Sequence, residues 1–198
     1  MTQVNCKEPP VLVLASASPR RHQLLHQLGV PFVTLVAGID EIAHPGESAR
    51  DFVLRMAREK ALAVMDRRDE PLPVLGSDTA VILDDVILGK PADRDEAINM
   101  LEQLSGRTHE VYSAVAVVVT EQEIYQALNI TRVTFERLER EWIESYCDTG
   151  DPMDKAGAYG VQGKAAEKIS TIEGSFYGVM GLPLYETAQL LHRAKVIF

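Results

Sequence analysis

Residues 11–22 of this 198-residue chain carry the pattern that points most directly to a chemistry. A short apolar strand leads into a turn with two hydroxyl groups, and a helix then begins with a proline and two arginines. Ser18 is suited to cap that helix, and Pro19 fits its first turn because a missing N–H has no cost there. The free N–H groups of such a helix start, beside Arg20 and Arg21, predict a site for an anion, with a polyphosphate as the natural ligand. The alternative is a strand-to-helix corner with two solvated arginines.

Asp78 is the acidic residue best placed for acid–base chemistry. It lies between the apolar pair Val74-Leu75 and a further apolar run, so the fold would point its carboxylate into a cleft. The alternative is a turn aspartate that bonds its own backbone. A separate acidic pair, Asp40 and Glu41, lies in a loop segment, where solvated carboxylates are the alternative to a metal site.

Two lysines are candidates for neutralising the charge of a phosphate ligand. Lys60 lies at the polar edge of an expected helix, where the alternative is a surface lysine that lays its stem along apolar neighbours. Lys90 lies between Gly89 and Pro91, and this restricted backbone favours a fixed direction for its side chain. A carboxylate activates water against a polyphosphate only weakly unless cations neutralise the phosphates, so a divalent metal is also expected.

The glycine-rich segment 155–163 is a candidate for close contact with the ligand. Its three glycines allow the backbone to approach a ligand closely. If the polyphosphate belongs to a nucleotide, Gln162 offers a donor and an acceptor that suit the edge of a uracil-like ring. Tyr159 could then stack on the base, and a core tyrosine is the alternative.

Together these segments resemble the Maf family of nucleotide pyrophosphatases. Four motifs carry the resemblance in order: Ser16-Ala-Ser-Pro-Arg-Arg21, Arg58-Glu-Lys-Ala61, Gly76-Ser-Asp-Thr79 with Gly89-Lys-Pro91, and the segment from Asp154 to Gly163. Four ordered motifs are far more specific than any one of them. The last segment resembles the branch that hydrolyses dTTP and UTP, and not the branch that acts on 7-methyl-GTP.

The resemblance implies roles for the charged residues. The residue that matches the family's general base is Asp78, which would activate water against a phosphorus atom. Glu41 and Asp78 would hold a divalent metal, Mg²⁺, Mn²⁺ or Co²⁺. Lys60 and Lys90 would be turned toward the phosphates and neutralise their charge during transfer.

The resemblance also implies roles in substrate binding. Ser16 and Arg20 would contact phosphate, and Arg21, Thr79 and Gln162 would together determine specificity. The implied reaction converts dTTP or UTP to the monophosphate and pyrophosphate, with water attacking the α phosphorus. The alternatives are the same chemistry on 7-methyl-GTP, and a nucleotide-sensing protein that binds without turnover. Retention of a base together with two lysines argues against a sensor.

Composition limits the function classes further. A formal net charge of −9 argues against a general nucleic-acid surface, so the basic residues must act locally in a pocket. Cys6 and Cys147 lie far apart without metal-ligand spacing, which favours a reduced cytoplasmic setting. No run has the length of a signal-peptide core or a membrane span, so no membrane partner is expected. The family resemblance suggests a homodimer.

The spacing of apolar and capping residues predicts strands and helices without regular alternation. Strands are expected at 12–14, 32–36, 74–75, 80–83, 86–88, 111–119 and 124–135, and helices at 19–28, 48–65, 93–106, 139–146 and 183–194. This mixture favours an α/β fold with a mixed, curved sheet flanked by helices in a single domain of residues 1–198. The resemblance implies two lobes with a central cleft, related to the inosine-triphosphate pyrophosphatase fold. Residues 1–9 are expected to form a flexible extension.

Overall fold

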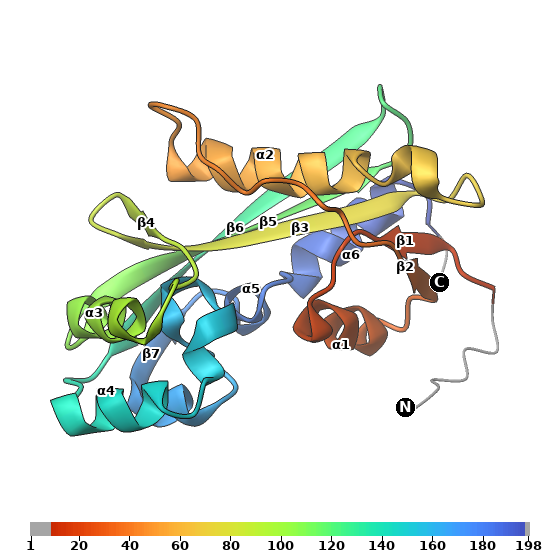
Figure 1. Ribbon diagram of the computed structural model, residues 1–198. Coiled ribbons are helices and arrows are strands. Elements are labelled where there is room, and N and C mark those ends of the chain that lie inside the picture. The colour runs from red at the N-terminus through yellow and green to blue at the C-terminus, as the bar shows by residue number, and fades with distance from the viewer. Residues whose placement is uncertain (1–8, 197–198) are drawn as a thin grey trace.

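The computed structural model describes residues 9–196, and a seven-stranded mixed sheet forms its centre (Figure 1). The strand order is β2-β1-β3-β5-β6-β7, and β4 pairs with the far end of β3. The strands are β1 (Leu12–Leu14), β2 (Phe32–Thr34), β3 (Val74–Leu83), β4 (Val86–Leu88), β5 (Thr108–Val118), β6 (Ile124–Phe135) and β7 (Ile169–Glu173). Residues 1–8, which include Cys6 and most of the expected extension, lie outside the described residues.

Helices cover both faces of this sheet (Figure 1). They are α1 (Pro19–Gln27), α2 (Ala49–Leu62), α3 (Arg94–Leu104), α4 (Arg140–Cys147), α5 (Phe176–Met180) and α6 (Leu184–Arg193). Short 3₁₀ turns occur at η1 (Met65–Arg67), η2 (Asp151–Asp154), η3 (Ala156–Ala158) and η4 (Lys164–Lys168). None of the helices between residues 9 and 196 has the length and hydrophobicity of a membrane-spanning segment.

The long strand β3 is buried on both faces, because α2 packs on one side and α1, α5 and α6 lie toward the other. Gly76 allows α2 to lie directly on the strand: a Cβ there would be 2.1 Å from the carbonyl oxygen of Ala57. Any larger residue would therefore push the helix away from the sheet. This close contact places Lys60, one turn beyond Ala57, over the middle of β3.

The sheet contains a gap beside the middle of β3. On that edge, β1 pairs with β3 only at Val74 and Leu75, and β4 pairs with it only from Val81 to Leu83. Residues 76–80 therefore have β5 on one side and neither β1 nor β4 on the other. The part with β1, β2 and α1 lies toward one end of the long strands, and the part with β4, α3 and α4 lies toward the other (Figure 1). This arrangement agrees with the expected two lobes.

Most predicted elements are confirmed, with two corrections. The predicted strands at 74–75 and 80–83 are one continuous strand, so Asp78 is a strand residue and its interpretation as a turn residue is wrong. Ser18 occupies the N-cap position of α1, but its side chain makes no capping hydrogen bond. The two residues between β3 and β4, Asp84 and Asp85, form a hairpin turn, and both have positive φ, as a two-residue turn of type I′ requires.

Candidate active site

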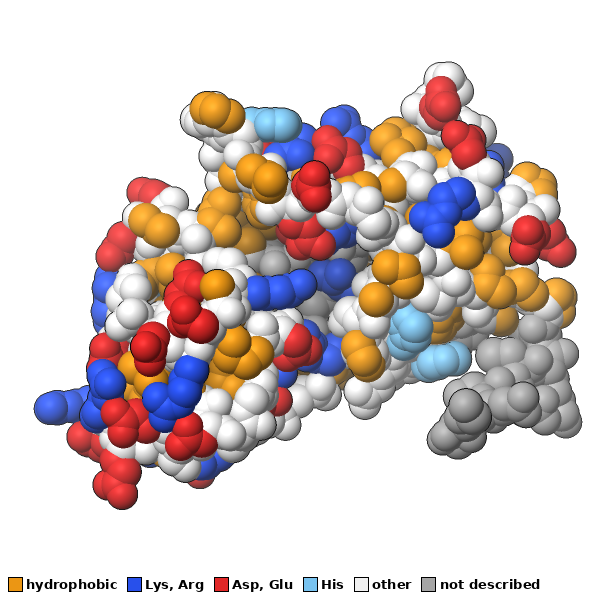
Figure 2. Space-filling view, in the orientation of Figure 1, with side chains coloured by type: hydrophobic (Ala, Val, Ile, Leu, Met, Phe, Trp, Pro, Cys, Tyr) orange, Lys and Arg blue, Asp and Glu red, His pale blue; other side chains and the backbone are white. Residues whose placement is uncertain are grey.

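A cleft of about 650 Å³ lies at the gap in the sheet. Lysine and arginine side chains gather in a hollow near the middle of the face shown in Figure 2. The cleft brings together all the predicted site residues: Ser16, Arg20, Arg21, Glu41, Lys60, Asp78, Thr79, Lys90 and Gln162. Because β1 and β4 end on either side of it, the segments that follow these strands both reach the same space.

Lys60 joins the two carboxylates at the centre of the cleft. Its Nζ lies 2.7 Å from Oδ1 of Asp78 and 2.8 Å from Oε1 of Glu41. Only 7% of Lys60 and 4% of Asp78 is exposed, so the interpretation of Lys60 as a surface lysine is wrong. A charge buried to this extent requires a partner, because removing it from water costs on the order of several kcal/mol per ion, even after the surrounding protein relaxes. Lys60 and Asp78 therefore each have a partner of opposite charge inside the cleft.

Glu41 lies in the long loop between β2 and α2. Burial alone would raise the pKa of Glu41, but the hydrogen bond from Lys60 and the nearby positive charges outweigh it, so its pKa lies below the ordinary value. These further charges include Lys90 and Arg21. Arg55 anchors the same loop, since it binds both carboxylate oxygens of Glu47 at 2.6 Å and the carbonyl oxygen of Ile42 at 3.0 Å.

The donor set at this centre fits a divalent cation that binds together with a phosphate ligand. Glu41 and Asp78 supply two carboxylates that share Lys60. Within residues 9–196 no three His, Cys, Asp or Glu side chains form a group that would hold an ion alone. Mg²⁺ commonly binds one or two carboxylates and completes its octahedral shell with water and substrate phosphates. The residues present are therefore suited to a shared metal site and not to a closed protein cage.

Arg21 connects three segments that are distant in the sequence. Its Nε donates to the carbonyl oxygen of Gly181 at 2.8 Å, and its other nitrogens lie 3.4 Å from Oγ of Ser16 and from Oγ1 of Thr79. Burial lowers the pKa of the Arg21 guanidinium, and the negative charge of Asp78 offsets part of that effect. Arg21 therefore lies beside Thr79, whereas Gln162 lies on another part of the cleft wall and makes no hydrogen bond to either residue.

Two further predicted cations, Arg20 and Lys90, lie near the mouth of the cleft. Arg20 is only partly solvated, because one of its nitrogens lies 3.3 Å from Oδ2 of Asp154 on the opposite wall. Asp154 is 64% exposed, so this ion pair is weak and a polyphosphate would compete with it for Arg20. Lys90 follows β4, is exposed and lines the same cleft.

The segment 151–163 forms the wall opposite α1, with Gln162 exposed on it. The alternative for Tyr159 is confirmed: it is a core residue, packed at 4.9 Å against the ring of Phe135, with its hydroxyl 2.8 Å from Nε2 of His109. Burial lowers the pKa of His109 to about 4, so this buried imidazole is neutral at pH 7.

Sequence reasoning missed two charged residues of this wall, Asp151 and Lys155. The Nζ of Lys155 lies 3.0 Å from Oδ1 of Asp151 and 2.6 Å from Oδ1 of Asp154. The available signal was the spacing of four residues between Asp151 and Lys155, which brings side chains together where the chain turns helically.

A solved structure shares the fold. The match to a HAM1 protein from Coxiella burnetii has a TM-score of 0.51 and covers 93% of this chain and 100% of that chain. The two sequences are only 17% identical, so the likeness concerns the fold alone. Together with the mixed sheet and its flanking helices, it confirms the predicted fold class.

Sequence relatives agree over nearly the whole chain. The dTTP/UTP pyrophosphatase of Bordetella pertussis is 51% identical over 197 residues, which cover 96% of this chain and 95% of the relative. The dTTP/UTP pyrophosphatase of Escherichia coli O6:K15:H31 is 51% identical over 180 residues, which cover 91% of each chain. A family model described as Maf-like protein matches residues 11–194. The chain therefore belongs to the Maf family.

Proposed function

We propose that this protein hydrolyses dTTP and UTP to the monophosphate and pyrophosphate, by attack of water on the α phosphorus. The observation that carries the proposal is the buried contact of Lys60 with Asp78 and Glu41 in a cleft that also holds Lys90 and Arg20. A carboxylate that lies beside several cations is suited to activate water against a negatively charged group. The names and high identity of the relatives favour these two substrates.

Each charged residue has a role in this reaction. Asp78 accepts a proton from the attacking water, and Lys60 holds that carboxylate in place through their hydrogen bond. Lys90 and Arg20 offset the charge of the phosphate chain, with the start of α1 beside it. A divalent metal held by Glu41 and Asp78 would supply further neutralisation of the phosphates.

Two alternative functions can be tested in the same way, by measuring turnover of different nucleotides. A purine substrate such as 7-methyl-GTP would need a different reading of the base, and the relatives named for pyrimidine nucleotides argue against it. A protein that only senses nucleotides has no need for a buried base such as Asp78. A homodimer and a cytoplasmic location are further parts of the proposal, which sedimentation and cell fractionation would test.

The position of the broken bond tests the proposal. Hydrolysis of UTP in ¹⁸O-labelled water is expected to place the label in UMP and none in pyrophosphate, because water attacks the α phosphorus and pyrophosphate leaves. Mass spectrometry of both products measures this. Label in pyrophosphate would mean attack at the β phosphorus, and formation of UDP with orthophosphate would mean attack at the γ phosphorus. Either result would contradict the mechanism.

Gln162→Ala is expected to lower kcat/KM for UTP and dTTP by roughly 10- to 100-fold, the scale of a lost base-edge hydrogen bond. Its effect on a poor substrate such as ATP is expected to be small, because ATP does not use that bond. Steady-state kinetics with the three nucleotides measure the difference. The matched control is Gln103→Ala, which removes an exposed glutamine of α3 outside the cleft lining. Equal losses on every nucleotide would mean that Gln162 supports the loop and does not read the base.

A further inference from the structure

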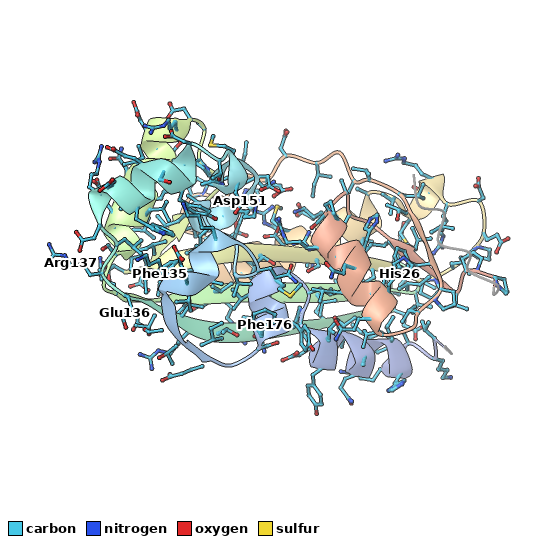
Figure 3. The ribbon with its side chains drawn as sticks, turned by 90° about the horizontal axis from the view of Figure 1, so that it is seen from below. His26, Phe135, Glu136, Arg137, Asp151 and Phe176 are labelled. Atoms are coloured by element: carbon cyan, nitrogen blue, oxygen red, sulfur yellow. The ribbon has the colours of Figure 1, made fainter. Side chains whose placement is uncertain are left out.

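We propose that Asp151 is a positioning residue for substrate preference: with Tyr146 and Lys155 it holds the turn that presents Gln162 to the base. The inference rests on the proposed function and extends it to residues outside the predicted site. Asp151 follows α4 and lies on the side of that helix toward α1 (Figure 3). It belongs to the cleft wall opposite the arginines.

The Asp151 carboxylate is the centre of a small network. Its Oδ2 accepts a hydrogen bond of 2.7 Å from the Tyr146 hydroxyl, and its Oδ1 lies 3.0 Å from Nζ of Lys155. Tyr146 is fully buried and the Lys155 side chain is 12% exposed. Burial alone would raise the pKa of Asp151, but the hydrogen bonds from Tyr146 and Lys155 outweigh it, so the pKa lies below its ordinary value. Both oxygens of a charged carboxylate are thus bound to partners that hold it in one orientation.

The turn that carries Gln162 packs against this network at both ends. The N–H of Gly160 donates to the Tyr146 hydroxyl at 3.2 Å, and a Cβ at Gly160 would lie 2.7 Å from Cε of Lys155. At the other end, a Cβ at Gly163 would lie 3.1 Å from Oδ2 of Asp151. The turn closes on itself through the N–H of Gly163 and the carbonyl oxygen of Gly160, 3.1 Å apart. A shift of the network would therefore shift the residues on both sides of Gln162.

The charges on this wall favour contact with the base of the nucleotide and not with its phosphates. Lys155 contacts both Asp151 and Asp154, so one cation faces two carboxylates. The remaining cations of the cleft lie elsewhere, on α1, on α2 and after β4. A wall whose cation is already neutralised attracts phosphate weakly and suits an uncharged ring. Lys155 therefore serves the loop and is not a further phosphate ligand.

The test combines Asp151→Asn with the wild-type and Gln162→Ala backgrounds. In the wild type, Asp151→Asn is expected to lower kcat/KM for UTP by roughly tenfold, mainly through KM, and to change kcat/KM for ATP by less than about twofold. In the Gln162→Ala background, the same substitution is expected to change the UTP to ATP ratio by less than about twofold, because it acts through Gln162. The matched control is Asp148→Asn, which removes an exposed carboxylate at the end of α4.

Two other outcomes would overturn the inference. An equal loss on UTP and ATP would mean that Asp151 only supports folding, and an undiminished loss of preference in the Gln162→Ala background would mean that Asp151 acts on the base independently. If Asp151→Asn does not fold, Lys155→Met removes the same ion pair while it retains a long apolar stem beside Gly160, and the same outcomes apply. A wild-type protein without a preference for UTP over ATP would instead contradict the proposed function.

Discussion

Asp78→Asn is expected to lower kcat for UTP hydrolysis by about a thousandfold and to leave nucleotide affinity within about tenfold. The amide retains the shape of the side chain and an oxygen that can accept from Lys60, but it cannot take the proton of the attacking water. Single-turnover kinetics measure the chemical step, and the affinity of a non-hydrolysable UTP analogue measures binding.

The matched control for this prediction is Asp40→Asn. Asp40 is an exposed carboxylate next to Glu41 and does not line the cleft, so its loss changes the net charge equally without touching the base. Near-normal turnover of Asp78→Asn would remove Asp78 from the role of general base and leave it only a part in binding. A large loss in Asp40→Asn would mean that charge near the loop, and not the base itself, controls the rate.

Local sequence was sufficient where one segment determines its own structure. The strand that leads into α1, the helix that Ser48 begins and the turn at Asp84 and Asp85 depend on capping, proline geometry and positive φ within a few residues. The cleft residues were identified instead through the family motifs, two of which lie inside regular elements: residues 58–61 in α2 and residues 76–79 in β3.

The environment of those residues could not be predicted in the same way. In the sequence, Lys60 lies at the polar edge of α2. Its burial beside Asp78 depends on the close packing of that helix on Gly76, which the local sequence does not show. Asp78 was expected beside a strand because the small and polar residues 76–79 interrupt the apolar pattern, and pairing with β5 carries the strand through them. Tertiary pairing therefore overrides the local preference at the site itself.

The cleft wall formed by segment 151–163 shows the same limit of prediction from local sequence. Glycines in segment 155–163 indicated a close approach of the backbone to a ligand, but all three approach the chain's own side chains: a Cβ at Gly157 would lie 2.9 Å from Cγ1 of Val81. Gly160 packs on Lys155 and Gly163 on Asp151. A glycine indicates that another group lies close to the backbone, but it does not identify that group.

Removal of divalent cations is expected to lower the rate of UTP hydrolysis by at least about a thousandfold, and Mg²⁺, Mn²⁺ or Co²⁺ is expected to restore it. The reason lies in the charge balance of the cleft: Lys60 is already shared by Asp78 and Glu41, so Lys90, Arg20 and Arg21 are left to face the charge of three phosphates. Activity in excess EDTA, and after readdition of each metal, measures the requirement. Full activity in chelator would contradict it.

Glu41→Gln tests whether Glu41 binds the metal, apart from its contact with Lys60. The substitution is expected to raise the Mn²⁺ concentration for half-maximal binding by roughly tenfold or more, measured by electron paramagnetic resonance with a non-hydrolysable UTP analogue present. The amide keeps an oxygen near Lys60, so the contact that holds Asp78 is preserved while one negative charge is lost. Asp40→Asn serves again as the control, since it removes the neighbouring charge without touching Lys60. An unchanged metal requirement in Glu41→Gln would place the metal on other ligands and leave Glu41 as a partner of Lys60 alone.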